Sequence, residues 1–143
     1  MTIRPRSVRA LREARVRLRD AAAASHAVAT AARDHSHLAL VRHQDTLEDF
    51  LDEATDILAA ANNVHDLLSV GDITGEYQLE IADASSRHAE AMAAAEASGE
   101  QLRDKARLLR RAEKLVERVT QERAKSDAKV EQRMNDDMTT RKR

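Results

Sequence analysis

Hydrophobic positions recur every three and four residues along most of the chain, with polar positions between them. This spacing places apolar side chains on one face of an α-helix. In the second half, one seven-residue column of positions runs from Ile81 to Val130, and another runs from Ala84 to Ser126. Two such columns, three residues apart, are typical of helices that pair in a coiled coil.

The first half shows the same period in two stretches that are out of step. The downstream columns begin at Leu40 and His43, and the upstream columns span residues 11–32 and 14–35. Ala32 and Leu40 are eight residues apart instead of seven. We therefore expect a local change in supercoil between these two positions.

Glycine and proline are rare, and their positions divide the chain into halves. The single proline, Pro5, stands where a helix can begin, because proline is tolerated in the first helical turn. Gly71 and Gly75 lie four residues apart in the segment SVGDITG, which is the strongest break in the chain. This segment predicts a turn over residues 69–75, with Thr74 as a plausible N-cap for the helix that follows.

The sequence therefore predicts an all-α fold, in which two long helices form an antiparallel coiled-coil hairpin. The helices are expected over residues 5–68 and 75–140, within a single unit that spans residues 1–143. Each helix would be about 95 Å long at 1.5 Å per residue. Helices of this length need a partner, because helical propensity alone does not stabilise them.

The composition of the 143-residue chain agrees with paired helices and disagrees with a globular core. Aromatic residues make up 1% of the chain and charged residues 34%, and 27 residues are alanine. A sheet protein is nearly excluded, because strands favour β-branched and aromatic residues. The predicted seam between the helices holds much alanine, serine and histidine, so each contact is expected to bury little area.

The same counts limit the cellular setting. The chain has no cysteine, which excludes a disulfide scaffold and a thiolate metal site. Its longest apolar stretches have five residues, whereas a membrane span needs about 20. The N-terminal residues are rich in arginine and lack the apolar stretch of a secretory signal. We expect a soluble, cytoplasmic protein that does not insert into a membrane.

Motifs for catalysis are missing from the sequence. The six histidines do not show the i, i+3 or i, i+4 spacing, with an acidic third ligand, of a helical metal site. We interpret them as solvated or seam residues. Acidic pairs such as Glu48 and Asp52 are interpreted as a solvated face, because a thin hairpin offers no pocket. No phosphate-binding loop or nucleophile elbow occurs. We expect no catalytic residue, cofactor or metal, and no enzyme activity.

The net charge of −1 hides a separation of charge along the chain. Residues 1–19 carry a net charge of +6, and residues 101–143 also carry +6. Between them, residues 20–66 carry −7 and residues 67–100 carry −6. In an antiparallel hairpin the two basic segments lie side by side. Such asymmetry indicates something about partners, and it says little about the fold.

The basic end has three interpretations. Arg9, Arg12 and Arg15 belong to a run of arginines that wraps around most of a helix, unlike a one-sided membrane face. Nucleic-acid binding through phosphates is one interpretation, but stacking aromatics are absent and acidic residues are mixed in, so we expect no nucleic acid. The second is an acidic protein partner that surrounds this end. The third is a charged face in solvent.

Apolar residues crowd the predicted turn. They either close the hairpin by local packing or form a small apolar patch within an acidic rim that a second partner binds. The residues considered for this patch are Leu68, Val70, Ile73 and Tyr77.

The C-terminal helix resembles a known family. Residues 109–118 read LRRAEKLVER, and the segments QER, EQ and DD follow before Arg141. This stretch resembles the terminal helix of the FliJ/YscO family, the central stalk proteins of type III export ATPases in flagella and injectisomes. The resemblance covers the whole chain in architecture, but in sequence mainly residues 107–141. The alanine-rich seam and the low aromatic content depart from the family pattern.

The resemblance implies a two-helix antiparallel coiled coil whose terminal end enters the pore of a hexameric export ATPase and promotes its assembly and activity. It also implies contacts with the cytoplasmic domain of the export gate and with secretion chaperones, at the periphery of a membrane secretion apparatus. Three alternatives stay open: a helical secretion chaperone or adaptor, a polyanion binder, and a structural spacer. The residues that the resemblance implies for the ATPase-facing segment are Arg110, Arg111, Glu113, Lys114, Glu117, Arg118 and Glu122.

Overall fold

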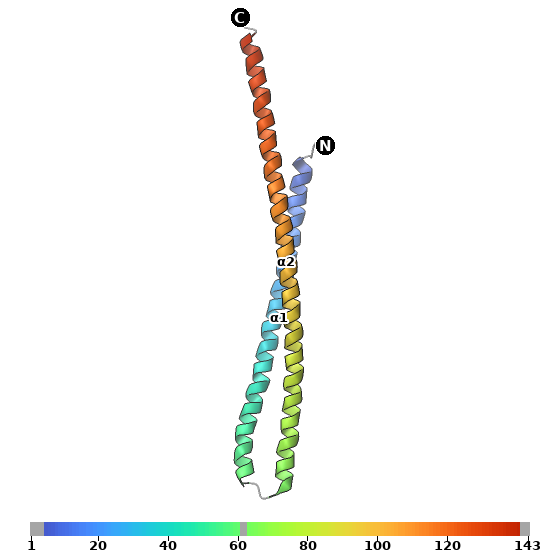
Figure 1. Cartoon of the computed structure of the whole chain (residues 1–143), viewed down its shortest axis with the longest axis vertical. Helices are drawn as coiled ribbons and strands as arrows, with labels where there is room; N and C mark the ends of the chain where they lie inside the picture. The colour runs from blue at the N-terminus through green and yellow to red at the C-terminus, as the bar shows by residue number, and fades with distance from the viewer. Residues whose placement is uncertain (1–4, 61–62, 141–143) are drawn as a thin grey trace. The chain divides into compact units, whose positions relative to one another are not determined.

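The computed structural model describes residues 5–60 and 63–140, and Arg141 of the quoted resemblance lies outside them. Within these residues the fold is all-α, as predicted (Figure 1). Helix α1 spans Pro5–Ala60 and helix α2 spans Val64–Thr140. The two helices contact each other in antiparallel order and form a helical hairpin, since residues early in α1 face residues late in α2. Neither helix holds, in the described residues, an apolar stretch able to cross a membrane.

The position of the predicted turn is wrong. Helix α1 ends at Ala60 and α2 begins at Val64, so residues 69–75 are helical. Asn63 caps α2, because its side-chain Oδ1 accepts a hydrogen bond of 2.9 Å from the backbone N–H of Asp66. The Asp66 carboxylate in the first turn also favours the positive end of the helix dipole. A capped start therefore decides the boundary.

Gly71 and Gly75 lie inside α2, where no side chain requires them. A Cβ atom added at either glycine would meet nothing within 4 Å. Each glycine costs the helix about 1 kcal/mol relative to alanine, and a helix of 77 residues tolerates this cost. Thr74 does not cap a helix either, since its hydroxyl donates a 2.7 Å hydrogen bond to the carbonyl of Val70 one turn earlier.

Packing contacts divide the chain into two units. One unit combines residues 1–23 with 101–143, and we call it the terminal unit. The other comprises residues 24–100, and we call it the loop unit. In each unit a segment of α1 packs against a segment of α2, and we call the facing positions the seam.

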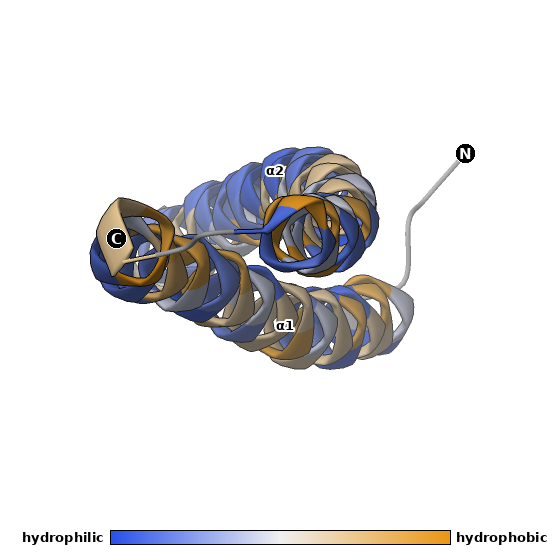
Figure 2. Ribbon diagram, turned by 90° about the horizontal axis from the view of Figure 1, so that it is seen from below, coloured by the Kyte–Doolittle hydropathy of each residue, from blue (hydrophilic) through white to orange (hydrophobic). Residues whose placement is uncertain are grey.

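The predicted seam of α2 is confirmed from Ile81 to Val119. All α2 residues in its two columns over this range are buried or half-buried. Figure 2 shows hydrophobic and hydrophilic residues interspersed along both helices. In the described residues the buried hydrophobic side chains are Val8, Ala54, Ala84, Ala95, Leu109 and Ala112.

The predicted upstream seam of α1 is wrong, and so is the change in supercoil. Leu11, Leu18 and Val28 are 40%, 45% and 71% exposed. Instead, the downstream columns continue towards the N-terminus in steps of seven without a break. The positions in these columns, each buried or half-buried, are 8, 15, 22, 29, 36, 43 and 50, and 19, 26, 33, 40, 47 and 54.

Polar residues at several of these α1 positions explain why the pattern misled the prediction. Arg15, Arg19 and Arg33 are half-buried in the seam columns. Arginine can lay its hydrocarbon stem along an apolar surface while its guanidinium reaches water. An uninterrupted heptad register in α2 requires an uninterrupted register in α1. Keeping this register stabilises the pair more than burial of Leu11 and Leu18 would.

Candidate functional site

The terminal unit brings the two predicted basic segments together. Arg12 on α1 lies beside Glu113 on α2, with 4.0 Å between Nε and Oε1. Both side chains are about half exposed, so this ion pair contributes little stability. The pair places the arginine-rich start of α1 beside residues 109–118 of α2.

Most of the side chains predicted to face an ATPase are exposed in the terminal unit. Arg15 differs, because it is half-buried one heptad after Val8 and occupies a seam position. The exposed candidates are Arg9, Arg12, Arg110, Arg111, Glu113, Lys114, Glu117, Arg118 and Glu122.

Helix α2 extends beyond the seam in this unit. Every α2 side chain from Thr120 to Met138 is exposed, although the predicted columns continue through Val130. Helix α1 begins at Pro5, and its first turns, at Val8 and Arg9, line a cleft with α2 residues between Val116 and Asp127. The rest of α2 therefore has no facing α1 residue among those described. This segment presents Val130, Met134 and Met138 to solvent.

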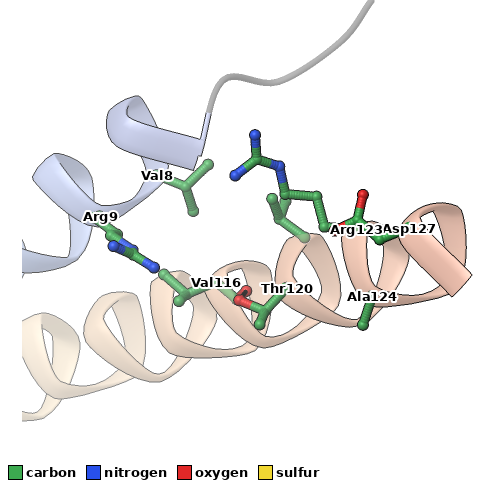
Figure 3. Close-up of a pocket in the computed structure, with 8 residues that line it drawn as sticks. Val8, Arg9, Val116, Thr120, Arg123, Ala124 and Asp127 are labelled. Atoms are coloured by element: carbon green, nitrogen blue, oxygen red, sulfur yellow. Dashed lines mark hydrogen bonds between the residues drawn. The ribbon is translucent and has the colours of Figure 1, made fainter. Parts of the chain in front are cut away.

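A shallow cleft marks the place where α1 begins beside α2. It has a volume of about 250 Å³. Val8 points from α1 towards α2, and Arg123 extends from α2 towards α1 (Figure 3). The hydroxyl of Thr120 donates a 2.8 Å hydrogen bond to the carbonyl of Val116 and is therefore already engaged. The residues that line the cleft are Val8, Arg9, Val116, Val119, Thr120, Arg123, Ala124 and Asp127.

The lining of the cleft combines apolar side chains with charged ones. Its valines offer an apolar floor, and Arg123 and Asp127 offer charges of both signs. The sequence prediction did not single out this cleft. The predicted heptad columns of α2 already contained Val116 and Val119. Val8 was missed because the predicted upstream columns of α1 are displaced by one residue from the observed seam columns.

The apolar residues predicted at the turn lie on the first turns of α2 in the loop unit. Leu68 and Ile73 are 62% and 39% exposed, whereas Val70 and Tyr77 are half-buried. The ring of Tyr77 packs against that of Phe50 on α1, with 5.3 Å between centroids. This patch therefore divides into two packing residues and two exposed residues.

Histidines and serines form polar contacts across the seam of the loop unit. The Ser98 hydroxyl donates to the carbonyl of Ala95, so the 2.9 Å bond between His26 Nδ1 and Ser98 Oγ has the imidazole as donor. Ser36 likewise donates to the carbonyl of Arg33 and accepts from His88 Nδ1 at 3.0 Å. These contacts give the histidines a structural role.

Across residues 5–60 and 63–140, no group of three or more His, Asp or Glu side chains could hold a metal ion. His37 and His88 approach each other closely, with 5.2 Å between ring centroids, but they form a pair without a third ligand.

The units differ sharply in charge. The terminal unit contains 21 basic and 10 acidic residues, and the loop unit contains 3 basic and 15 acidic residues. All six histidines belong to the loop unit. The chain is thus an all-α helical hairpin with one basic and one acidic unit. Comparisons with models of protein families, with curated proteins and with solved structures gave no match. Function is therefore argued from charge, exposure and packing.

Proposed function

We propose that the protein is a non-enzymatic stalk component of a type III export ATPase complex. The terminal unit enters the pore of the hexameric ATPase and promotes its assembly and activity. The proposal rests on the resemblance of residues 107–141 to FliJ/YscO proteins. The observation that carries it is that the arginine-rich start of α1 packs against residues 107–123 of α2, with most of the arginines of both segments exposed.

The exposed continuation of α2 supports this function. A helix that enters a ring of subunits needs side chains exposed on all of its faces, and the side chains of residues 120–138 are exposed. The excess of basic residues in the terminal unit would attract acidic loops lining a pore and would speed their association.

The loop unit supplies a second contact in this proposal. Leu68 and Ile73 are exposed near the start of α2, and Asp66 and Asp72 lie beside them in sequence. An apolar patch with a charged rim is the usual anatomy of a protein interface. This patch would bind the cytoplasmic domain of the export gate or a secretion chaperone, so that the complex lies at the cytoplasmic side of a secretion apparatus.

The test measures hexamer formation and ATP hydrolysis by the cognate export ATPase with increasing amounts of the full chain. The wild-type protein is expected to increase both. Arg9→Glu combined with Arg12→Glu should lose most of the stimulation, because it reverses two exposed charges of the terminal unit. The matched control is Arg42→Glu combined with Arg87→Glu, which makes the same charge change on exposed residues of the loop unit.

Three results would contradict the proposal. The first is an unchanged ATPase in the presence of the wild-type chain. The second is equal loss of stimulation in both double variants, which would assign the effect to net charge. The third is a compact complex with an exported client in place of the ATPase, which would favour a secretion chaperone. Circular dichroism of each variant checks that the helices remain intact.

A further inference from the structure

One face of α2 in the terminal unit carries a row of basic side chains, which we call the basic stripe. At about 100° per residue, an arc about 100° wide contains ten positions between residues 103 and 129. Eight are Lys or Arg, and the other two are Gln121 and Ala128. All are exposed, and the stripe is about 39 Å long at 1.5 Å per residue. Its basic residues are Arg103, Arg107, Arg110, Arg111, Lys114, Arg118, Lys125 and Lys129.

One face of α1 in the loop unit carries the opposite charge. Six carboxylates occupy positions i, i+3, i+4, i+7, i+8 and i+11, which is the spacing of a single helix face. All six are exposed. Residues 43–86 contain no Lys or Arg, so Arg42, one turn before Asp45, is the nearest strong base to this face in sequence. We call it the acidic stripe, and its residues are Asp45, Glu48, Asp49, Asp52, Glu53 and Asp56.

Contacts within the chain leave both stripes almost unpaired. In the described residues no ion pair involves the acidic stripe, and the basic stripe has one, between Arg107 and Asp104 of the same helix at 3.3 Å. Each stripe also lies on the side of its helix away from the seam. The seam positions are Leu109 and Ala112 for α2 and Leu47 and Ala54 for α1.

We infer that two copies of this chain associate, with the basic stripe of one copy lying along the acidic stripe of the other. Both stripes follow helical spacing, so their charges face one another when the helices lie side by side. The terminal unit has an excess of 11 basic residues and the loop unit an excess of 12 acidic residues. A net charge of −1 leaves little overall repulsion between copies.

A nucleic acid is a weaker candidate for the basic stripe. Single strands bind best where bases stack on aromatic side chains, and the terminal unit has no Phe, Tyr or Trp. Duplex phosphates would bind basic side chains in any arrangement. The acidic stripe of the same chain, in contrast, presents carboxylates at the helical spacing of the basic stripe. The basic stripe shares Arg110, Arg111, Lys114 and Arg118 with the segment proposed to face the ATPase, so a second copy and the ATPase would compete for these residues. Association of two copies is tested with the purified chain alone, without the ATPase.

Sedimentation velocity of the full chain tests the inference across a concentration series. At about 10 mM salt, where charges interact over about 30 Å, the mass should rise above 15.9 kDa with concentration. At about 1 M salt, where the screening length is about 3 Å, the mass should return to that of one chain. This salt dependence separates charged contacts from association through the exposed apolar residues.

Charge reversal assigns the contact to the stripes. Arg110→Glu, Arg111→Glu and Lys114→Glu together should weaken association by about tenfold or more, because three attractive pairs become repulsive. The matched control reverses three exposed basic residues of the terminal unit outside the stripe, Arg6→Glu, Arg17→Glu and Arg133→Glu. It makes the same change in net charge and should weaken association far less.

A rescue experiment completes the test. Asp49→Lys, Asp52→Lys and Asp56→Lys together should also abolish self-association. An equimolar mixture of this variant with the variant reversed at residues 110, 111 and 114 should associate again, because each copy then meets an oppositely charged stripe. Circular dichroism shows whether each variant keeps its helices.

Four results would overturn the inference. They are a single-chain mass at the highest concentration and lowest salt, equal weakening by the matched control, failure of the mixture to associate, and a mass insensitive to salt. A chain that stays single but retards duplex DNA through the basic stripe would also overturn it in favour of a polyanion ligand.

Discussion

The buried seam positions of the terminal unit include large aliphatic side chains, whereas those of the loop unit are all alanine. In the terminal unit Val8 and Leu109 are buried, and Leu102 and Val116 are half-buried around them. In the loop unit the buried positions are Ala54, Ala84 and Ala95. Larger aliphatic side chains remove more apolar area from water, so the terminal unit gains more from each contact.

The loop unit compensates with specific contacts. Its seam contains the hydrogen bonds from His26 to Ser98 and from His88 to Ser36, and the ring contact of Phe50 with Tyr77. Polar contacts of this kind add little net stability, but they fix which residues face each other. One pair of helices therefore buries its largest aliphatic side chains in the terminal unit, while hydrogen bonds and a ring contact fix its register in the loop unit.

Truncation of a large side chain should have the largest effect, and it should fall on the terminal unit. Leu109→Ala is expected to lower the free energy of unfolding by about 2–4 kcal/mol, because Leu109 is 7% exposed and its removal leaves a cavity. Urea unfolding followed by circular dichroism measures this loss. Leu79→Ala, at a side chain 73% exposed on the same helix, is the control. An equal loss in both would remove the distinction between seam and surface.

Enlargement of a small buried side chain should destabilise the loop unit. Ala54→Leu is expected to lower the free energy of unfolding by about 1–3 kcal/mol, because Ala54 is 2% exposed and a larger side chain would overpack its surroundings. Ala32→Leu is the control, since Ala32 is exposed in the corrected register and both residues are strong helix formers. The same measurement applies. If Ala32→Leu destabilised the protein and Ala54→Leu did not, Ala32 would belong to the seam, as the upstream columns predicted.

Loss of the cap should weaken the loop unit by a smaller amount. Asn63→Ala is expected to cost about 1 kcal/mol, because the N–H of Asp66 loses its hydrogen-bond acceptor. Asn63→Asp keeps an acceptor at the same position and should retain most of the stability. Thermal unfolding of the two variants in parallel distinguishes them. Identical midpoints would show that the boundary of α2 does not depend on this cap.

The glycines should give the smallest and most selective effects. Gly71→Ala and Gly75→Ala are each expected to raise the free energy of unfolding by about 0.5–1 kcal/mol, because a methyl group meets open space there. Gly99→Ala should gain less, since its Cβ would lie 3.2 Å from Cε1 of His26.

A second substitution tests this explanation. In a His26→Ala background, Gly99→Ala should gain as much as Gly71→Ala, because the imidazole that crowds the new methyl group is gone. Chemical unfolding of the single and double variants measures the difference. An undiminished gain at Gly99 in the wild-type background would show that the His26 contact imposes no constraint.

The amino-acid sequence by itself determined the helical fold, the pairing of the helices and the separation of charge. The period of Leu109, Ala112 and Val116 is local, so it can be read without knowledge of the partner helix. The same holds for most basic residues of the terminal unit, whose exposure follows from the cost of burying charge. Nine of the ten side chains predicted to face an ATPase are accordingly exposed.

Tertiary structure decided the turn and the register of α1. Gly71 and Gly75 weaken a helix, but only the balance with the Asn63 cap and the packing of Tyr77 on Phe50 places them inside α2. In α1, Leu11 and Leu18 lie on one face of the helix, and Arg15 and Arg19 lie on the adjacent face. Local periodicity predicted that the face with the leucines packs against α2. The face with the arginines packs against α2 instead, because the seam of α2 is continuous and a helix pair must keep one register along both of its members.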